Sequence, residues 1–205
     1  MTGGGYARGM VRTHQTTWKT YADYLALPEG VKAELIDGEL LMSPQPKGRH
    51  VRVASFLGAQ LLVRFGSSAH ATSDGAGGWW ILDEPEVHLK TDVRVVVPDI
   101  AGWRRERMPE PPSDSHKFLV VPDWICEILA PGTWNRDALV KMPRHLEAGV
   151  QWAWVVDPVA QRVDVFHADG REWVVAGAFE GAVKAAIPPF EAVELDLAPW
   201  WSTPA

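Results

Sequence analysis

Two short apolar runs, residues 93–99 (VRVVVPD) and 123–129 (DWICEIL), decide how this chain folds. Both are rich in β-branched, aromatic or other apolar residues, which is typical of buried strands. Each run also carries a carboxylate, Asp99 at the end of the first and Glu127 inside the second. A buried carboxylate costs several kcal/mol unless a positive charge compensates it. On neighbouring strands the two carboxylates can share one divalent cation, for which oxygen is the preferred ligand.

The length and composition indicate one globular domain in a reducing compartment. The chain has 205 residues, of which 46% are hydrophobic and 22% are charged. We expect a disordered tail over 1–15, a single domain over 16–198 and a C-terminal tail over 199–205. Cys126 is the only cysteine, so no intrachain disulfide can form and a cytoplasmic location is expected. No apolar run is long enough to cross a membrane, and the Gly-rich start does not resemble a signal peptide.

The charge of the chain does not by itself indicate nucleic-acid binding. The net charge is −6, whereas nucleic-acid-binding domains usually carry a basic stripe. Two local basic clusters nevertheless stand out, one with Arg49 beside His50 and one with Arg104 and Arg105. These residues are either contacts to phosphate or DNA or ordinary solvated side chains.

The first half of the chain predicts two helices and a hairpin. Apolar residues at helical spacing predict helices over 16–27 and 47–65, the second with Phe56 on its buried face. Between them, residues 34–42 predict a hairpin turning at Asp37-Gly38, because both residues of such a turn need positive φ. Short strands are expected at 79–82 and 87–89.

The second half predicts a helix between strands. The helix covers 135–148, with Pro143 kinking or restarting it and Gly149 ending it. Strands are expected at 152–156, 162–167 and 173–175. This order of elements favours a mixed sheet with flanking helices.

The two carboxylates suit phosphodiester hydrolysis, which needs an activated water and neutralisation of the charge on phosphorus. A divalent ion held by carboxylates supplies both. A nearby lysine can orient the water or stabilise the transition state. Lys141, on the helix after the Glu127 strand, is the better candidate, because Lys117 falls in a loop. The alternative for Lys141 is a solvated surface side chain.

Several motifs occur in the order found in one family, and together they cover about residues 18–167. The chain resembles the Uma family of restriction endonucleases, within the PD-(D/E)XK nuclease superfamily. The motifs are 34–40 (ELIDGEL), Pro98-Asp99, 122–131 (PDWICEILAP), Arg136-Asp137 followed by Lys141, and 149–158 (GVQWAWVVDP).

The resemblance implies an α/β (α+β) fold with a restriction-endonuclease-like core, flanking helices and an added antiparallel β meander. It also implies Mg²⁺, or Mn²⁺ in its place, bound by Asp99 and Glu127, DNA as the substrate and a homodimer. Glu34 matches an acidic residue of the family's first motif, with a hairpin-edge charge as the alternative. His50 matches a histidine often seen there, and a capping or surface histidine is the alternative. The implied catalytic set is Glu34, Asp99, Glu127 and Lys141.

The sequence departs from the superfamily pattern close to the expected site. Leu129 stands where the general motif has lysine, and the family supplies the basic residue from the following helix, which corresponds to Lys141. His145 occupies a position where tyrosine is frequent, and residues 130–132 (APG) replace Ser-Pro-Ser. These changes keep a second hypothesis open, a catalytically inactive scaffold that binds DNA or a protein partner. A third hypothesis is self-association through the tryptophans, including an exposed Trp200-Trp201 pair.

Overall fold

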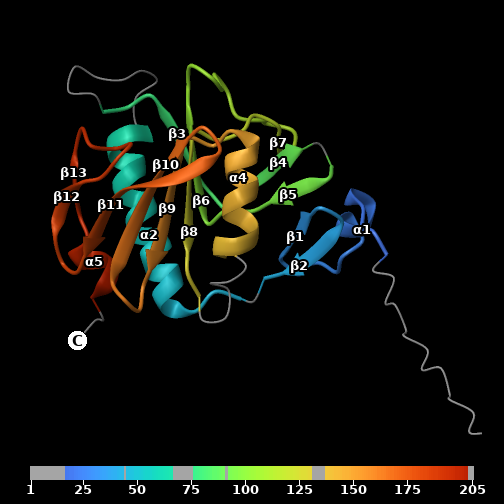
Figure 1. Ribbon diagram of the computed structural model, residues 1–205, viewed down its shortest axis with the longest axis horizontal. Helices are drawn as coiled ribbons and strands as arrows, with labels where there is room; N and C mark the ends of the chain where they lie inside the picture. The colour runs from blue at the N-terminus through green and yellow to red at the C-terminus, as the bar shows by residue number, and fades with distance from the viewer. Residues whose placement is uncertain (1–16, 44, 67–75, 91, 131–136, 203–205) are drawn as a thin grey trace, which may run out of the picture.

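Three sheets and a few helices make up the structure, a computed structural model that describes residues 17–43, 45–66, 76–90, 92–130 and 137–202. The predicted N-terminal tail, the first residue of the predicted 16–27 helix and the first two residues of the predicted 135–148 helix lie outside the described residues. In Figure 1 the six-stranded sheet lies beside a smaller sheet that carries the N-terminal hairpin.

The larger sheet is mixed. Its strand order is β11-β10-β9-β8-β6-β3, and only the β8–β9 pair is parallel. β9, β10 and β11 follow one another as antiparallel neighbours, so the predicted mixed sheet with an added antiparallel meander is confirmed. The strands are β3 (Trp79–Asp83), β6 (Ile100–Arg104), β8 (Trp124–Ile128), β9 (Trp152–Asp157), β10 (Arg162–Asp169) and β11 (Glu172–Glu180).

The smaller sheet has the order β2-β1-β5-β4-β7 and contains the predicted hairpin. Asp37 and Gly38 adopt φ values of 50° and 82°, which suit the type I′ turn expected from their sequence. A separate pair, β12 (Lys184–Ala186) and β13 (Glu194–Asp196), lies near the C-terminus. The strands of the five-stranded sheet are β1 (Ala33–Ile36), β2 (Glu39–Met42), β4 (Glu86–Lys90), β5 (Arg94–Val96) and β7 (Lys117–Phe118).

Helical segments cover both faces of the larger sheet. α2 (Gly48–Leu61), continued by the π-helical turn η1 (Leu62–Gly66), packs on one face with its buried residues Val53, Leu57, Leu61 and Phe65. The π-helical turn η2 (Asp137–Lys141) and α4 (Met142–Ala148) lie on the other face. Pro143 sits in the first turn of α4 and Gly149 ends it at φ 98°, so the predicted restart and stop are confirmed. The short helices α1 (Tyr21–Leu25) and α5 (Ala198–Trp201) lie near the two ends.

Four sequence-based expectations need correction. The run 93–99 is not one strand, because β5 ends at Val96 and β6 starts only after Pro98 and Asp99. The first helix is capped by Thr20, which forms a capping box with Asp23, so it covers Tyr21–Leu25 and not the whole of the expected 16–27. The burial of two side chains is the reverse of what the sequence indicated. Phe56, expected on the buried face of its helix, is 41% exposed, and Trp200, expected to be exposed, is buried in the core.

Phe190 is the centre of an aromatic cluster that joins the C-terminal segment to the core. Its ring lies 4.9–5.6 Å, centroid to centroid, from the rings of Phe65, Trp79, Trp124 and Trp154. Such pairs add about 0.5–1.5 kcal/mol each beyond the area they bury. The segment after β11 is therefore part of the domain core.

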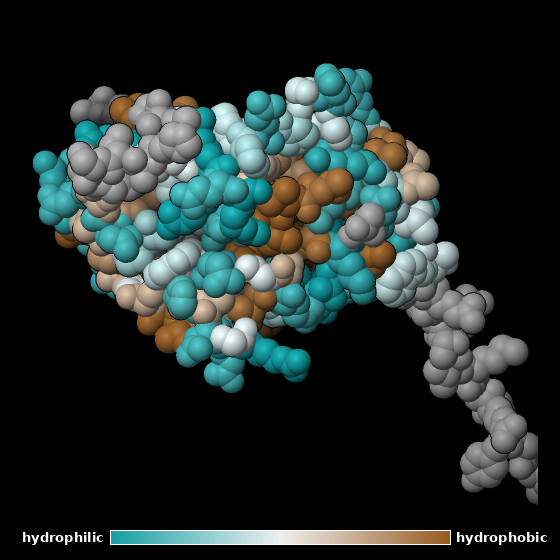
Figure 2. All heavy atoms as spheres, turned by 90° about the horizontal axis from the view of Figure 1, so that it is seen from above, coloured by the Kyte–Doolittle hydropathy of each residue, from teal (hydrophilic) through white to brown (hydrophobic). Residues whose placement is uncertain are grey.

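None of the described helices is both long and apolar enough to cross a bilayer. Figure 2 shows one face of the molecule as mainly hydrophilic, with hydrophobic side chains gathered in a patch near its centre.

We predict that Phe190→Ala lowers the free energy of unfolding by about 3–5 kcal/mol, because it opens a cavity between four aromatic rings. Urea unfolding followed by tryptophan fluorescence measures this loss. Val175→Ala is the control, since Val175 is 63% exposed and its truncation should change stability by less than about 0.5 kcal/mol. Equal effects of the two substitutions would contradict the central position of Phe190.

Candidate functional site

Asp99 lies in the connection between the two sheets. It follows β5 of the smaller sheet and directly precedes β6 of the larger one. Its Oδ2 accepts a hydrogen bond of 2.6 Å from the backbone N–H of Ile128, which fixes the carboxylate against β8. Because Ile100 pairs with Cys126, Asp99 is placed beside Glu127 on the neighbouring strand. The two carboxylates line the same cavity, as predicted.

Glu127 faces this cavity because side chains alternate along β8. Cys126 points into the core beneath α2, as expected, and Glu127 lies on the opposite face. Only 3% of the Glu127 side chain is exposed. Its Oε2 lies 2.7 Å from Lys141 Nζ and its Oε1 lies 3.3 Å from His145 Nε2. Both oxygens therefore have a nitrogen partner from the same helical segment.

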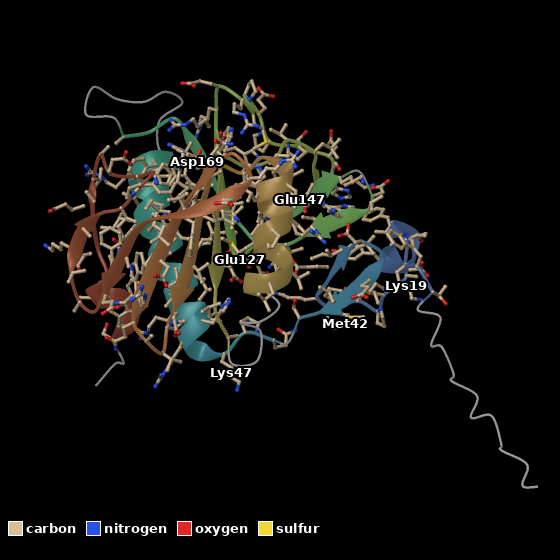
Figure 3. All side chains as sticks on the ribbon, in the orientation of Figure 1. Lys19, Met42, Lys47, Glu127, Glu147 and Asp169 are labelled. Carbon is tan, nitrogen blue, oxygen red and sulfur yellow. The ribbon has the colours of Figure 1, made fainter. Side chains whose placement is uncertain are left out.

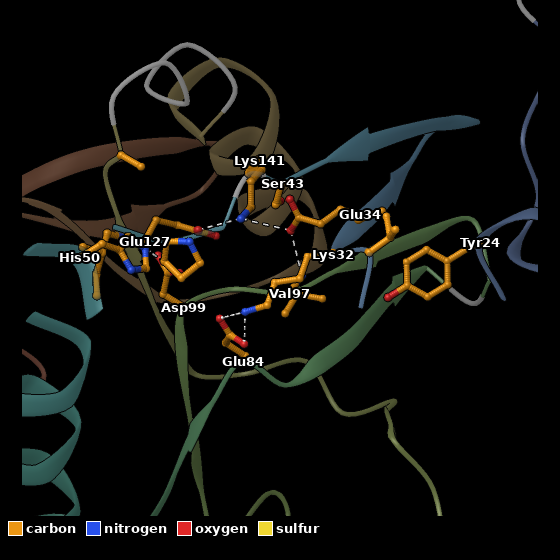
Figure 4. A pocket seen from close by; sticks show the side chains of 15 residues that line it. Tyr24, Lys32, Glu34, Ser43, His50, Glu84, Val97, Asp99, Glu127 and Lys141 are labelled. Atoms are coloured by element: carbon orange, nitrogen blue, oxygen red, sulfur yellow. Dashed lines mark hydrogen bonds and ion pairs between the residues drawn. The ribbon is translucent and has the colours of Figure 1, made fainter. Parts of the chain in front are cut away.

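Lys141 stands between two glutamates. Its Nζ is 2.7 Å from Glu127 and 3.1 Å from Glu34 Oε1, and 4% of its side chain is exposed (Figure 4). Lys141 ends the π-helical turn η2 and precedes α4, so local helix geometry turns it towards the sheet. The alternative of a solvated surface lysine is wrong.

Glu34 reaches the cavity from the hairpin. It lies on β1, its side chain is 2% exposed, and its Oε1 accepts a hydrogen bond of 2.8 Å from the N–H of Val97. Its Oε2 is buried and has no hydrogen-bond partner among the described residues. Glu34 is therefore not a solvated charge at the hairpin edge, and one of its oxygens can take a further ligand.

His50 comes from the first turn of α2 and pairs with Asp99. The distance from His50 Nε2 to Asp99 Oδ1 is 3.0 Å. Burial disfavours the charged imidazole, but the hydrogen bond and the charge of Asp99 outweigh burial and raise the pKa of His50. His50 is thus a partner of the carboxylate in the cavity and not an isolated surface histidine.

The charge of Glu127 is stabilised by its neighbours. Burial by itself raises the pKa of this carboxyl, but the charge of Lys141 and the hydrogen bonds from His145 and Lys141 lower it below its usual value. Glu127 is therefore ionised at neutral pH. A buried ionised carboxylate is a ligand ready for a cation.

The cavity as a whole carries excess negative charge. It has a volume of about 230 Å³, and four carboxylates and two lysines line it. Glu84, at the turn between β3 and β4, is the fourth carboxylate, and Lys32 pairs with it at 2.5 Å (Figure 4). The two lysines leave two of the four carboxylate charges uncompensated, and a protonated His50 leaves one. Phosphate can approach such a cavity favourably only if a cation enters with it.

The residues fit a hard divalent cation. Among the described residues, no group of three or more His, Cys, Asp or Glu side chains is arranged to hold a metal ion. Mg²⁺, however, is commonly held by one or two carboxylates, with waters and substrate phosphates completing its shell. Asp99 and Glu127 provide such a pair of oxygen ligands, and the unpartnered oxygen of Glu34 lies in the same cavity.

Other predicted residues lie elsewhere. Arg104 and Arg105 are at the far end of β6, about 17 Å along the strand from Asp99. Their guanidinium groups cover the rings of Trp79 and Trp80, so they do not belong to this cavity. Arg49 is exposed at the start of α2 and lines a neighbouring cavity. Lys117 lies on the short strand β7 and not in a loop as expected, and it pairs with Asp92 outside the site.

Sequence reasoning did not assign His145 to the site. The side chain is fully buried and its Nε2 contacts Glu127. The signal was its position four residues after Lys141, because residues at i and i+4 of a helix share a face. Once Lys141 is placed against Glu127, the same face brings His145 to the other oxygen.

The fold and the cavity define a class of protein, a restriction-endonuclease-like α+β domain. The chain belongs to the Uma2 family, described as "Putative restriction endonuclease", whose model matches residues 21–198. The fold is similar to that of a crystal structure from Anabaena variabilis ATCC 29413, described as "a putative nuclease belonging to DUF820". The two chains are 24% identical with a TM-score of 0.69, and the match covers 89% of this chain and 97% of that one. A comparison with curated proteins gives no match.

We predict that Lys141→Met destabilises the fold by about 3–5 kcal/mol at pH 7, because it leaves two carboxylates buried without their cation. In the wild type, the lowered pKa of Glu127 contributes stability above the unfolded pKa of about 4.3, which is lost as pH falls through the folded value. In the variant, burial raises that pKa instead, so acidification from pH 7 to pH 5 should restore part of the lost stability.

Urea unfolding at several pH values between 5 and 8 measures this reversal. Lys184→Met is the matched control, since Lys184 is exposed on β12 and its loss should cost little at any pH. A loss of stability that is the same at pH 5 and pH 8 would show that Lys141 does not compensate buried carboxylates.

Proposed function

We propose that this protein is a divalent-metal-dependent DNA endonuclease that hydrolyses phosphodiester bonds. The observation that carries the proposal is the meeting of Glu34, Asp99, Glu127 and Lys141 in one cavity. These four residues come from β1, the β5–β6 connection, β8 and the turn before α4. The membership in a family of restriction endonucleases supports the same activity.

Asp99 and Glu127 would hold the ion, with Mg²⁺ as the natural cofactor and Mn²⁺ as a substitute. When bound, such an ion would supply positive charge to the phosphate and lower the pKa of a water molecule. Asp99 is fixed by the N–H of Ile128 and by His50, and Glu127 by Lys141 and His145. This preorganisation keeps both carboxylates in the cavity and oriented before any ligand enters.

Lys141 is the basic residue of the mechanism. Its ammonium group lies in the cavity, where it can donate a hydrogen bond to the attacking water or to a phosphate oxygen. Glu34 and Glu127 hold Nζ from two sides and so determine where the donor lies. Glu34 also assists through its second oxygen, by way of a water or a second ion.

His50 and Arg49 are the proposed contacts to phosphate on the α2 side of the site. His50 lines the catalytic cavity, and Arg49 is its neighbour in sequence. Contacts by Arg104 and Arg105 would involve DNA at the other end of β6, remote from the cleaved bond.

We predict that the purified protein nicks or cuts DNA in the presence of Mg²⁺ or Mn²⁺, and that Asp99→Asn and Glu127→Gln each lower the rate at least 100-fold. Conversion of supercoiled plasmid to nicked and linear forms measures the activity. Glu172→Gln, an exposed carboxylate on β11, is the matched control and should cut normally. Unchanged cleavage by folded Asp99 and Glu127 variants would reject this site.

We further predict one Mn²⁺ site that depends on Asp99. Isothermal titration of Mn²⁺ should give a binding signal in the wild type and in Glu172→Gln, and no signal in Asp99→Asn. The same titration distinguishes the enzyme from an inactive scaffold. A wild type that binds neither Mn²⁺ nor Mg²⁺ while still binding DNA would favour the scaffold.

A further inference from the structure

A second cavity, of about 380 Å³, lies next to the catalytic one, where the N-terminal turn of α2 meets α5 and the turn between β9 and β10. α5 contacts α2, and Arg52 in the second turn of α2 donates a hydrogen bond to the carbonyl oxygen of Pro199 in α5. The polar and aromatic residues that line the cavity are Arg49, Arg52, Gln161, Trp200, Trp201 and Ser202.

The lining of this cavity is the electrostatic opposite of the catalytic one. It contains two arginines and, among the described residues that form it, no aspartate or glutamate. The structure gives neither Arg49 nor Arg52 an ion pair with a described residue. Arg52 makes a long hydrogen bond of 3.5 Å to the carbonyl oxygen of Pro199, and its guanidinium lies 5.5 Å from the centre of the Phe56 ring. In a chain of net charge −6, two guanidinium groups in one cavity without a carboxylate partner among the described residues favour an anionic ligand.

Further hydrogen-bond donors belong to residues that line the same cavity. The indole N–H of Trp200 is buried without a partner among the described residues, although such groups are usually satisfied. The first N–H groups of α2 have no acceptor within the helix, and the capping residue Lys47 provides none from its side chain. Gln161 and Ser202 can donate as well. Phosphate oxygens are suitable acceptors for a set of this kind.

The two cavities share the first turns of α2. His50 projects into the catalytic cavity, whereas Arg49 and Arg52 line the second one. The two sites therefore lie on different sides of one helix, whose diameter with side chains is about 10–12 Å. A separation of this size lies within the reach of one nucleic-acid strand, so phosphates of the same strand can occupy both sites.

We propose that Arg49 and Arg52 bind two neighbouring backbone phosphates of the substrate strand, a few nucleotides from the bond cleaved at Asp99. This assignment rests on the proposed function, because it takes the ligand to be the nucleic acid that enters the catalytic cavity. It accounts for how an acidic protein retains a polyanion: the strand is held at a basic cavity beside the acidic one. Arg49 and Arg52 are binding residues and not catalytic ones.

The test is the salt dependence of DNA binding by full-length protein in EDTA, where cleavage cannot interfere. Fluorescence anisotropy of labelled 20-nucleotide single-stranded and duplex DNA gives Kd between 50 and 200 mM NaCl. Each lost phosphate contact reduces the slope of log K against log salt by about 0.7 for single strands and 0.9 for duplex. The double variant Arg49→Gln/Arg52→Gln should therefore lose about 1.4 or 1.8 from the slope. For single-stranded DNA, the ratio of the Kd of the double variant to that of the wild type should fall about sevenfold between 50 and 200 mM NaCl.

The control is Arg64→Gln/Arg171→Gln, which removes the same charge from exposed positions on η1 and in the β10–β11 turn and should leave the slope within about 0.3 of the wild type. Arg49→Lys/Arg52→Lys keeps both positive charges, so the slope of log K against log salt should stay close to that of the wild type. Because Arg49 is exposed, Arg49→Gln alone should fold whether or not the double variant does. It should reduce the slope of log K against log salt by about half as much as the double variant. Equal slopes for the double variant and the control would overturn the assignment.

Two further experiments are needed. One distinguishes DNA phosphate from free phosphate as the ligand, and the other distinguishes failure of the endonuclease proposal from failure of the arginine assignment. Inorganic phosphate at 10 mM should compete weakly with DNA. If phosphate alone protects the wild type against thermal unfolding through Arg49 and Arg52, and DNA does not, the cavity binds free anions and the assignment fails. If the wild type binds DNA with the predicted arginine dependence but never cuts it, the endonuclease proposal is rejected and the assignment of Arg49 and Arg52 to DNA phosphate is supported. A wild type that binds no DNA would overturn both.

Discussion

The ammonium group of Lys141, held between Glu34 and Glu127, is the interaction on which the site depends. Glu34 belongs to the smaller sheet, Glu127 to the larger sheet and Lys141 to the turn before α4, so three separate parts of the fold meet at one buried charge. None of the three side chains is stable there without the others, since an unpaired buried charge costs several kcal/mol. The geometry of the site and the packing of the two sheets therefore depend on each other.

The connection from β5 to β6 is the second constraint. Pro98 cannot donate a ladder hydrogen bond, so the run of valines stops pairing in the smaller sheet and the chain enters the larger sheet at Ile100. Asp99 stands at this crossing, and backbone N–H and His50 side-chain contacts hold its carboxylate. A residue at a junction between sheets can face a cavity that neither sheet would form by itself.

Charge is divided between neighbouring cavities on the two sides of α2. One has an excess of carboxylates and suits a cation, while the other is lined by arginines and suits an anion. A phosphodiester substrate with its metal needs both environments, because the ion must be held where the bond is cleaved and the strand must be attracted from solution. The first turns of α2 contribute to both cavities through adjacent residues, so its orientation sets the distance between them.

The sequence by itself determined the elements whose signals are local. The Asp37-Gly38 turn, the restart at Pro143, the stop at Gly149 and the alternation that separates Cys126 from Glu127 all follow from the preferences of single residues or of one strand. It also indicated Asp99 and Glu127 as partners, because each is a carboxylate in an apolar run and needs a positive charge that one shared cation can provide.

Only the tertiary structure decided what depends on residues far apart in the chain. It separated the 93–99 run into a strand and a crossing, buried Trp200 and brought His145 to Glu127. It also moved Arg104 and Arg105 away from the site and gathered Arg49, Arg52 and Trp200 around a second cavity. The physical reason is that burial and charge pairing are properties of the assembled sheets, to which residues 34, 99, 127 and 141 contribute from separate elements.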